Sequence, residues 1–202
     1  MAYGEALERM HQAVAERAAD RIADTLQLVR HPPVITLGRK RGATESVLVP
    51  RDIPVVAVER GGDATYHGPG QLVAYPIFKL GGADRDLHRF LRRLEQTVIA
   101  ALDGLGVAGE RSPGLTGVWV GRRKIASIGV AVRSWVSYHG VSLDVAPDPG
   151  FMAIRPCGMD SQIMTSLEEV LGRPVDFGQV RQAWLDAFCR VFDFDGGDFV
   201  CK

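Results

Sequence analysis

The chain has few cysteines: Cys157, Cys189 and Cys201 are scattered along its 202 residues. Their number and spacing exclude the disulfide framework of a small secreted domain and a zinc site built on paired cysteines. No run approaches the roughly 20 apolar residues that a membrane helix needs. Residues 1–24 are amphipathic and interspersed with charge, and they lack the apolar centre and cleavage site of a signal peptide. We therefore expect a reduced, cytoplasmic protein with no membrane partner.

The sequence also lacks an excess of charge of either sign. Lys plus Arg and Asp plus Glu both number 24, which gives a formal net charge of zero at pH 7. Proteins that bind nucleic acid usually carry a strong basic excess, so we expect no nucleic-acid partner. Apolar residues make up 46% of the chain, which is enough for a hydrophobic core. Because no linker, repeat or low-complexity tract divides the chain, we expect a single domain over residues 1–202.

The apolar residues predict three helices and a set of short strands. In residues 3–14, 87–102 and 180–191 they recur every three or four positions and so cover one helix face. Runs rich in β-branched and aromatic residues, separated by Gly and Pro, predict strands at 25–29, 34–37, 55–58, 72–77, 115–120, 124–132 and 136–145. Several neighbouring strands have no helix between them. We therefore expect an α+β fold with a mixed, largely antiparallel sheet covered by helices.

The most unusual stretch is residues 60–71, which read RGGDATYHGPGQ after a predicted strand. Four glycines and a proline in twelve residues are compatible with a long turn, but they also let a ligand approach bare backbone N–H groups. Arg60, Tyr66, His67 and Gln71 add polar side chains to the same loop. That combination favours a ligand site over a simple turn.

Two further segments carry candidate reactive groups. The run KIASIGV, typical of a buried strand, begins at Lys124 directly after two arginines. A lysine in that place is usually a solvated charge, so alone it indicates no chemistry. The motif RPCGM places Cys157 between Pro and Gly, in a loop that could present its thiol. Free cysteines are most often inert and buried, as we expect for Cys189 in the third helix, whereas Cys201 is expected to be frayed.

Taken together, these motifs resemble the octanoyltransferases, the lipoyl(octanoyl) transferases of lipoate biosynthesis. The matching segments are TLGR at 36–39, RGGDATYHGPGQL at 60–72, GVWVGRRKIASIGV at 117–130, YHGVSLDV at 138–145 and RPCGM at 155–159. They follow the family's order and span nearly the whole chain, together with an N-terminal helix that contains a tyrosine. The resemblance implies the α/β architecture that this family shares with lipoate–protein and biotin–protein ligases.

The resemblance also assigns roles to particular residues. The thioester-forming cysteine of the family falls on Cys157, and the lysine that assists it falls on Lys124. The acyl-binding segments fall on Arg60, Gly61, Gly62, Asp63, Ala64, Thr65, Tyr66 and His67, on Ser127, Ile128 and Gly129, and on Gly140, Val141 and Ser142. His139, Gln71 and Asp144 are expected to support these segments.

Two positions depart from the family pattern. Ser142 and Asp144 stand where family members more often have Ala and Asn. The serine is a small change. Asp144 adds a negative charge near the expected site, which makes its role as a polar linker less certain.

The reaction implied by the resemblance has two steps. An octanoyl group passes from the phosphopantetheine arm of octanoyl-acyl carrier protein to Cys157. It then passes to a lysine of apo lipoyl domains, those of 2-oxoacid dehydrogenase complexes and of the glycine cleavage H protein, as the first committed step of endogenous lipoylation. The resemblance implies no ATP, metal or other cofactor.

The thiol of a free cysteine is only a few per cent ionised at pH 7, so the first step needs a group that favours the thiolate. An ammonium group does so, and we expect Lys124 to hold the thiolate and exchange protons in both steps. His67 and His139 remain alternative bases, because Cys/His pairs are the commoner arrangement.

Other functions remain open at the level of sequence. An ATP-dependent lipoate or biotin ligase would share the fold, and residues 38–42 resemble the adenylate loop of biotin ligases. Such a ligase has no use for a nucleophilic cysteine, and the chain has no Walker-type loop. A non-catalytic acyl-carrier binding protein and a Cys/His hydrolase are further alternatives. The basic residues Arg39, Lys40, Arg41, Arg89, Arg92, Arg93, Arg122 and Arg123 are candidate docking charges for acidic carriers, or ordinary solvated surface.

Overall fold

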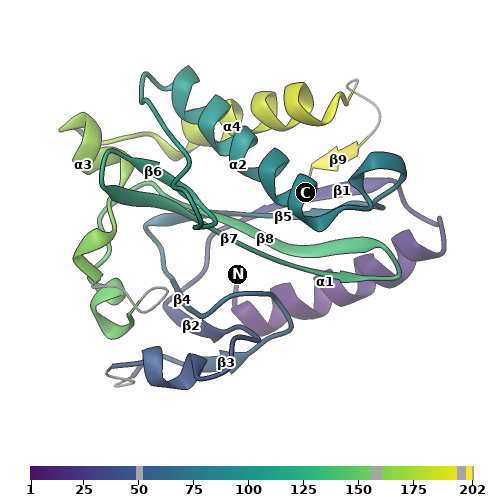
Figure 1. Cartoon of the computed structure of the whole chain (residues 1–202), viewed down its shortest axis with the longest axis horizontal. Helices are drawn as coiled ribbons and strands as arrows, with labels where there is room; N and C mark the ends of the chain where they lie inside the picture. Colours follow the sequence, from purple (N-terminus) through teal and green to yellow (C-terminus); the bar gives the residue numbers. More distant parts are fainter. Residues whose placement is uncertain (49–51, 156–160, 195–198, 202) are drawn as a thin grey trace.

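The computed structural model describes residues 1–48, 52–155, 161–194 and 199–201. Within them a six-stranded sheet has the order β6-β7-β8-β5-β1-β9 (Figure 1). Its strands are β1 (Asp24–Val29), β5 (Gln71–Ile77), β6 (Val118–Val120), β7 (Arg123–Arg133), β8 (Val136–Asp144) and β9 (Phe199–Cys201). Neighbouring strands are antiparallel except for β1 and β9, which are parallel.

A smaller sheet of three strands, in the order β3-β2-β4, lies apart from the large one (Figure 1). Its strands are β2 (Val34–Leu37), β3 (Val55–Ala57) and β4 (Ala64–His67). The strands β2 and β3 are parallel, whereas β2 and β4 are antiparallel. Tyr3 packs with Val34 and Val58, which joins this sheet to the start of the N-terminal helix.

Helices cover both faces of the six-stranded sheet (Figure 1). The helices are α1 (Tyr3–Ala18), α2 (Leu87–Gly104), α3 (Leu167–Leu171) and α4 (Phe177–Phe192), with 3-10 turns at Ala43–Ser46, Gly82–Asp84, Pro149–Ala153 and Ser161–Ile163. The helix α1 lies on one face, and α2 and α4 lie together on the other. The side chain of Asp86 caps α2 by accepting hydrogen bonds from two backbone N–H groups of the first turn. None of the helices in the described part of the chain is long and apolar enough to span a membrane.

The central strand β5 is buried along its whole length, because helices pack on both of its faces. Leu72 and Ala74 belong to the core formed with α2 and α4. Val73, Tyr75 and Ile77 point the other way and pack against α1. A strand that is buried on both sides has no polar face, which explains the continuous apolar run in its sequence.

The predicted α+β fold, with three main helices and a largely antiparallel sheet, is confirmed. Three elements were missed. The strand β4 lies inside the glycine-rich stretch, which was expected to be a loop. The expectation that Cys201 is frayed was wrong, because β9 pairs it with Leu26. The five-residue α3 is too short to show a helical period, although Ser166 and Glu169 form a capping box at its start.

Candidate active site

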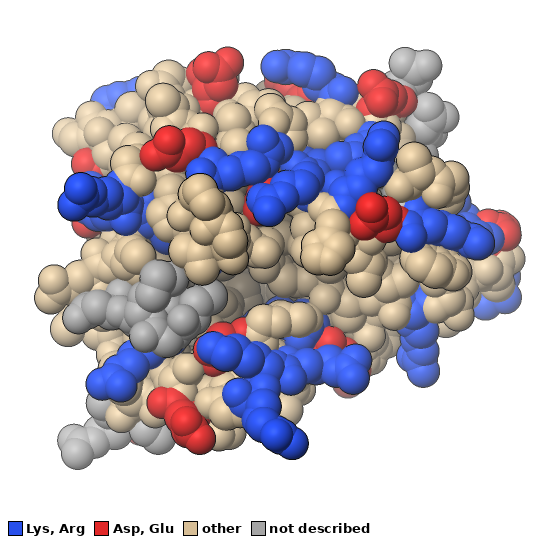
Figure 2. All heavy atoms as spheres, viewed as in Figure 1, with Lys and Arg blue, Asp and Glu red and all other residues tan. Residues whose placement is uncertain are grey.

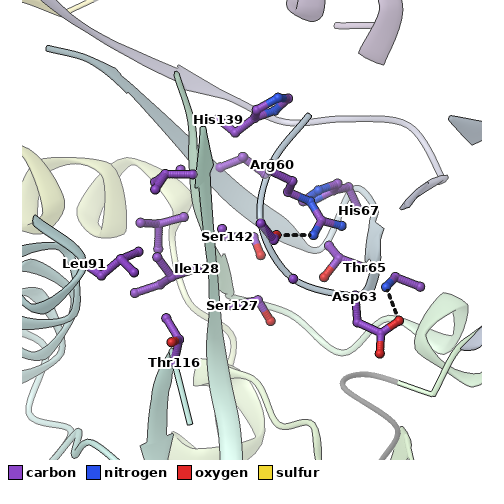
Figure 3. A pocket seen from close by; sticks show the side chains of 18 of the residues that line it. Arg60, Asp63, Thr65, His67, Leu91, Thr116, Ser127, Ile128, His139 and Ser142 are labelled. Carbon is purple, nitrogen blue, oxygen red and sulfur yellow. Dashed lines mark hydrogen bonds between the residues drawn. The ribbon is translucent and has the colours of Figure 1, made fainter. Parts of the chain in front are cut away.

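A cavity of about 390 Å³ lies between the glycine-rich segment and the strands β7 and β8. It is lined by Tyr3, Arg60, Gly61, Gly62, Asp63, Ala64, Thr65, His67, Val73, Tyr75, Leu87, Leu91, Gly114, Leu115, Thr116, Lys124, Ser127, Ile128, Gly129, Val130, His139, Gly140, Val141 and Ser142. Figure 3 shows Ser127 and Ser142 on the same side of the strands as Thr65. Leu91 and Ile128 lie on the other side. The polar wall of the cavity thus lies on the side of the strands that faces the glycine-rich segment, whereas Leu91, Ile128 and Thr116 lie on the other side.

Most of the residues predicted for the acyl-binding segments line this cavity. Tyr66 does not: its hydroxyl donates to Asp148 Oδ1 at 2.8 Å, and its ring packs against Phe151. Gln71 and Asp144 lie behind the lining and bond to each other. Several lining residues come from other elements and were not predicted, namely Tyr3, Val73, Tyr75, Leu87, Leu91, Gly114, Leu115, Thr116 and Val130. Most of them belong to apolar helix stripes or strand runs, a pattern that indicates core packing and does not by itself indicate a pocket.

Two glycines allow close backbone packing here, Gly129 against the glycine-rich segment and Gly140 against the neighbouring strand β5. Gly129 and Gly140 are cross-strand partners. A Cβ atom on Gly140 would come within 2.2 Å of the carbonyl oxygen of Ala74, and one on Gly129 within 3.0 Å of the carbonyl oxygen of Gly61. The backbone N–H of Gly61 donates to the carbonyl oxygen of Val130 at 3.0 Å. A side chain at Gly129 would therefore push the glycine-rich segment away from β7, whereas one at Gly140 would push β8 away from β5.

Lys124 is buried, with 3% of its surface exposed, and it lines the cavity. The strand β7 contains an extra residue at this point, because Val118 pairs with Ala126 and Trp119 pairs with Lys124. Ile125 is thus a bulge, and both it and Ala126 enter the core under α2 and α4. Strict alternation would place Lys124 on the face opposite to Ser127, so the bulge turns the lysine into the cavity.

The space around the Lys124 side chain depends on a glycine. Gly117 has φ +133°, and a Cβ atom there would lie 2.8 Å from Lys124 Cε and 3.4 Å from Nζ. The ammonium nitrogen also lies 5.2 Å from the centroid of the Trp119 ring, within the range of a cation–π contact. Lys124 is therefore confined on two sides by the segment that leads into β6.

A hydrogen-bonded chain fixes the protonation of His67. Gln71 Nε2 donates to the carbonyl oxygen of Tyr66 at 3.1 Å and to Asp144 Oδ1 at 2.8 Å. Because a carbonyl oxygen can only accept, the amide has one orientation, and its Oε1 faces His67 Nδ1 at 3.0 Å. His67 Nδ1 must then carry the proton. Its Nε2 is left as a hydrogen-bond acceptor.

Burial shifts the pKa of His67 and that of Asp144, the two residues that Gln71 joins, so that each favours its neutral form. Burial, together with electrostatic interactions with His31 and Arg60, lowers the pKa of His67 to about 3, so the imidazole is neutral at pH 7. Burial raises the pKa of Asp144 well above its usual range, although Gln71 and Lys124 oppose the shift. The shift favours the neutral form of Asp144 and so opposes the negative charge that the sequence suggested there.

His139 occupies an unusual backbone conformation for a strand, with φ +56°. Its Nδ1 lies 3.4 Å from the hydroxyl of Tyr3. Its Nε2 lies 3.4 Å from Glu59 Oε2, but it makes no hydrogen bond to any described residue. Burial lowers the pKa of His139 to about 4, so we regard this pair as a contact with a neutral imidazole. Burial likewise raises the pKa of Tyr3 to about 12.

Arg60 and Asp63 tie the polar wall to the small sheet. The guanidinium of Arg60 donates to the carbonyl oxygen and hydroxyl of Thr36 at 2.8 and 2.9 Å. Asp63 accepts from the N–H of Ala64 at 2.7 Å and forms an ion pair with Lys40 at 2.6 Å. Burial alone would raise the pKa of Asp63, but these partners outweigh it and lower the pKa. Both side chains therefore carry charge at the cavity wall.

The predicted nucleophile Cys157 is one of residues 156–160, which lie outside the described residues. The residues that follow this segment pair with the backbone of Lys124. Met164 forms a β-bridge with Lys124, and the N–H of Thr165 donates to the carbonyl oxygen of Lys124 at 2.9 Å. Over the described parts of the chain, no group of three or more His, Cys, Asp or Glu side chains is arranged to hold a metal ion.

The model of the lipoyl protein ligase A/B catalytic domain matches residues 2–189 of this chain. Two solved structures share the fold. Lipoate-protein ligase A bound with ATP has a TM-score of 0.76 at 18% identity, covering 96% of this chain and 83% of that one. An archaeal bipartite lipoate protein ligase from Thermoplasma acidophilum has a TM-score of 0.69 at 20% identity, covering 96% and 82%. The chain therefore belongs to the lipoyl protein ligase A/B catalytic domain family.

Curated relatives narrow this assignment within the family. The octanoyltransferase of Geobacter metallireducens is 48% identical over 189 residues, which cover 93% of this chain and 88% of the relative. That of Syntrophotalea carbinolica is 49% identical over 182 residues, which cover 90% and 85%. The chain is thus an acyltransferase of the octanoyltransferase group.

Proposed function

We propose that the chain transfers an octanoyl group from octanoyl-acyl carrier protein, through a thioester on Cys157, to a lysine of apo lipoyl domains. The names of the relatives supply the acyl group. The observation that carries the mechanism is the buried Lys124, which a β-bulge turns into a cavity of about 390 Å³. That volume lies within the usual range for small-molecule pockets.

In the first step of the proposed reaction, the Cys157 thiolate attacks the carbonyl carbon of the carrier thioester. The bond to the phosphopantetheine sulfur breaks, and Lys124 donates a proton to that leaving thiolate. The product is an octanoyl thioester on Cys157, and Lys124 is left neutral. An ammonium beside the thiol favours the thiolate before attack, which is the property that an unassisted cysteine lacks at pH 7.

In the second step, the amine of the acceptor lysine attacks the thioester. Neutral Lys124 takes a proton from that amine as the bond to Cys157 Sγ breaks, so the enzyme returns to its starting state. Exchange of one thioester for another is nearly neutral in free energy, whereas formation of the amide is favourable. We therefore propose that neither ATP nor a metal ion takes part.

The two histidines are assigned to the pocket instead of to proton transfer. His67 has a free Nε2 acceptor, but its pKa of about 3 makes it a weak base near neutral pH. His139 has a pKa of about 4 and contacts Tyr3 and Glu59. Lys124 lines the cavity and is confined beside Gly117, so we assign the proton transfers to it.

The proposed donor is an acidic carrier protein, and basic residues flank the cavity. The N–H groups of Arg39 and Lys40 donate to the carbonyl oxygens of Arg60 and Gly62, so this exposed basic segment borders the cavity wall. On the other side, Leu87 and Leu91 of α2 line the cavity. Figure 2 shows Lys and Arg side chains on both sides of a hollow in this face.

The test is incubation with octanoyl-loaded acyl carrier protein and an apo lipoyl domain, followed by mass spectrometry of the acceptor. We expect one octanoyl group on one lysine in the absence of ATP. Free octanoate as the main product would favour a hydrolase. ATP–pyrophosphate exchange with octanoate, which we expect to be absent, would favour a ligase.

A further inference from the structure

Glu95 is a charged residue in the middle of α2 that is almost completely buried, with 1% of its surface exposed. Its carboxylate has three partners on two segments. Oε2 accepts from Arg92 at 2.6 Å and from Arg111 at 3.0 Å. Oε1 accepts from the backbone N–H of Gly117 at 3.2 Å. A buried carboxylate needs this degree of pairing to remain ionised, and the pairing fixes its orientation.

The segment from Arg111 to Gly117 is attached to α2 at both ends. At one end, Arg111 also donates to the carbonyl oxygen of Arg92 at 3.1 Å and to Gln96 Oε1 at 2.9 Å. At the other end, the N–H of Gly117 is held by Glu95. The residues between these ends include Leu115, which lines the cavity. Glu95 thus connects a helix to one wall of the site.

Gly117 in turn limits where the Lys124 side chain can go. Its φ of +133° brings its Cα next to the end of the lysine, where a Cβ would lie 2.8 Å from Cε. A lysine side chain has four rotatable bonds, so its amine is placed accurately only where neighbouring atoms restrict it. Displacement of Gly117 would give Lys124 room to leave its position.

We propose that Glu95 is a positioning residue for Lys124, acting through the backbone of Gly117. The inference rests on the proposed function, because it takes Lys124 to be the group that exchanges protons. Glu95 itself touches neither substrate nor reacting atom. Its partners Arg92 and Arg111 keep the carboxylate aimed at the Gly117 N–H.

The test compares Glu95→Ala and Glu95→Gln with Thr97→Val. Thr97 is a matched control, because it is also polar, buried and on α2, but its hydroxyl bonds to the carbonyl oxygen of Arg93 and not to the wall of the site. Each variant is measured for kcat, for KM of the octanoyl carrier, and for the pH dependence of kcat. The charged and titratable groups that share this environment with Lys124 include Tyr3, Arg60, Asp63, His67, Tyr75, His139, Asp144, Asp148 and Glu169, and none of them is changed.

We expect Glu95→Ala to lower kcat about tenfold to a hundredfold, with KM unchanged within about twofold and the pH profile displaced. Glu95→Gln keeps an oxygen that can accept from Gly117, so it should recover part of kcat. A kcat and pH profile like those of Thr97→Val would overturn the inference.

A second variant keeps the test decisive where Glu95→Ala fails to fold. Gly117→Ala leaves Glu95 intact, and its Cβ would lie 2.6 Å from the carbonyl oxygen of Ala126 and 2.8 Å from Lys124 Cε. It therefore disturbs the packing of Gly117 against Lys124, and we expect the same loss of kcat and the same displaced pH profile. A normal pH profile in Gly117→Ala would overturn the inference. Full activity in Lys124→Ala would instead overturn the proposed function, so the two failures are distinguishable.

Discussion

The charge states of single side chains in this site are set by burial and by long-range hydrogen bonds. His67 and Asp144 would be partly or fully charged in water near neutral pH, yet burial shifts the pKa of each towards the neutral form. The side chain of Gln71 hydrogen-bonds to both residues, and these bonds fix the orientation of its amide. His67, Gln71 and Asp144 therefore supply polar groups beside the cavity in mainly neutral form.

We predict that Asp144→Asn is more stable than the wild type and that the difference in the free energy of unfolding grows as the pH rises. Folded Asp144 binds a proton between its usual pKa, about 3.8, and its raised pKa, while the unfolded chain does not. Stability of the wild type therefore falls with rising pH in that window, and asparagine removes this term while keeping an acceptor for Gln71. Urea unfolding from pH 4 to pH 8 should show a difference that grows to about 1 kcal/mol or more. A difference that stays constant over this range would contradict the raised pKa.

At the scale of elements, two backbone irregularities in β7 and β8 shape the site. The bulge at Ile125 turns Lys124 towards the cavity. Gly129 lets the glycine-rich segment approach β7, and its cross-strand partner Gly140 lets β8 lie close against β5. Bulges and strand glycines such as these often lie beside functional sites.

We predict that Gly140→Ala destabilises the fold and reduces activity. The new Cβ would lie 2.2 Å from the carbonyl oxygen of Ala74 and 2.6 Å from Pro76 Cδ, and neither neighbour is the end of a flexible side chain. The strands β5 and β8 must separate to admit it, at a cost of about 1–3 kcal/mol in the free energy of unfolding. Thermal unfolding checks this value. Gly104→Ala is the control, because nothing lies within 4 Å of its Cβ position.

The sequence could predict the regular elements but not the irregular ones. The stripes of α1, α2 and α4 and the apolar runs of most strands were sufficient for the fold class. The glycine motif and its resemblance to a family indicated most of the cavity lining. Strict alternation of side chains along β7, however, would place Lys124 on the face opposite to Ser127. Only the pairing with β6 reveals the bulge that turns it into the cavity. The bond between Gln71 and Asp144 joins residues 73 positions apart, and no local pattern indicates it.

At the scale of the whole molecule, the net charge of zero conceals an uneven surface. Basic side chains lie on both sides of the hollow in Figure 2. Arg39 and Arg41 are exposed on the segment that borders the glycine-rich wall. Arg89 and Arg92 are exposed on α2, whose first turns contribute Leu87 and Leu91 to the cavity. An acidic partner could thus contact both sides of the opening.

We predict that reversing the charge of Arg39 and Arg41 to Glu raises KM for the octanoyl carrier roughly threefold to tenfold, with kcat nearly unchanged. The effect should shrink as salt rises from about 0.05 to 0.5 M, because exposed charges are screened. Steady-state kinetics at two salt concentrations check it, with Arg21→Glu, three residues after the end of α1, as the control. An unchanged KM in the double variant would assign these arginines to ordinary solvated surface.

The central claim is the pairing of Cys157 with Lys124 in acyl transfer. The most direct measurement is the intact mass of the enzyme after mixing with octanoyl-acyl carrier protein and quenching in acid. We predict one octanoyl adduct on Cys157 in the wild type, its disappearance when an apo lipoyl domain is added, and no adduct in Cys157→Ser. In Lys124→Ala we predict adduct formation slowed by about a hundredfold or more. Transfer to the lipoyl domain with no adduct on the wild-type enzyme, or undiminished adduct formation in Lys124→Ala, would contradict the account.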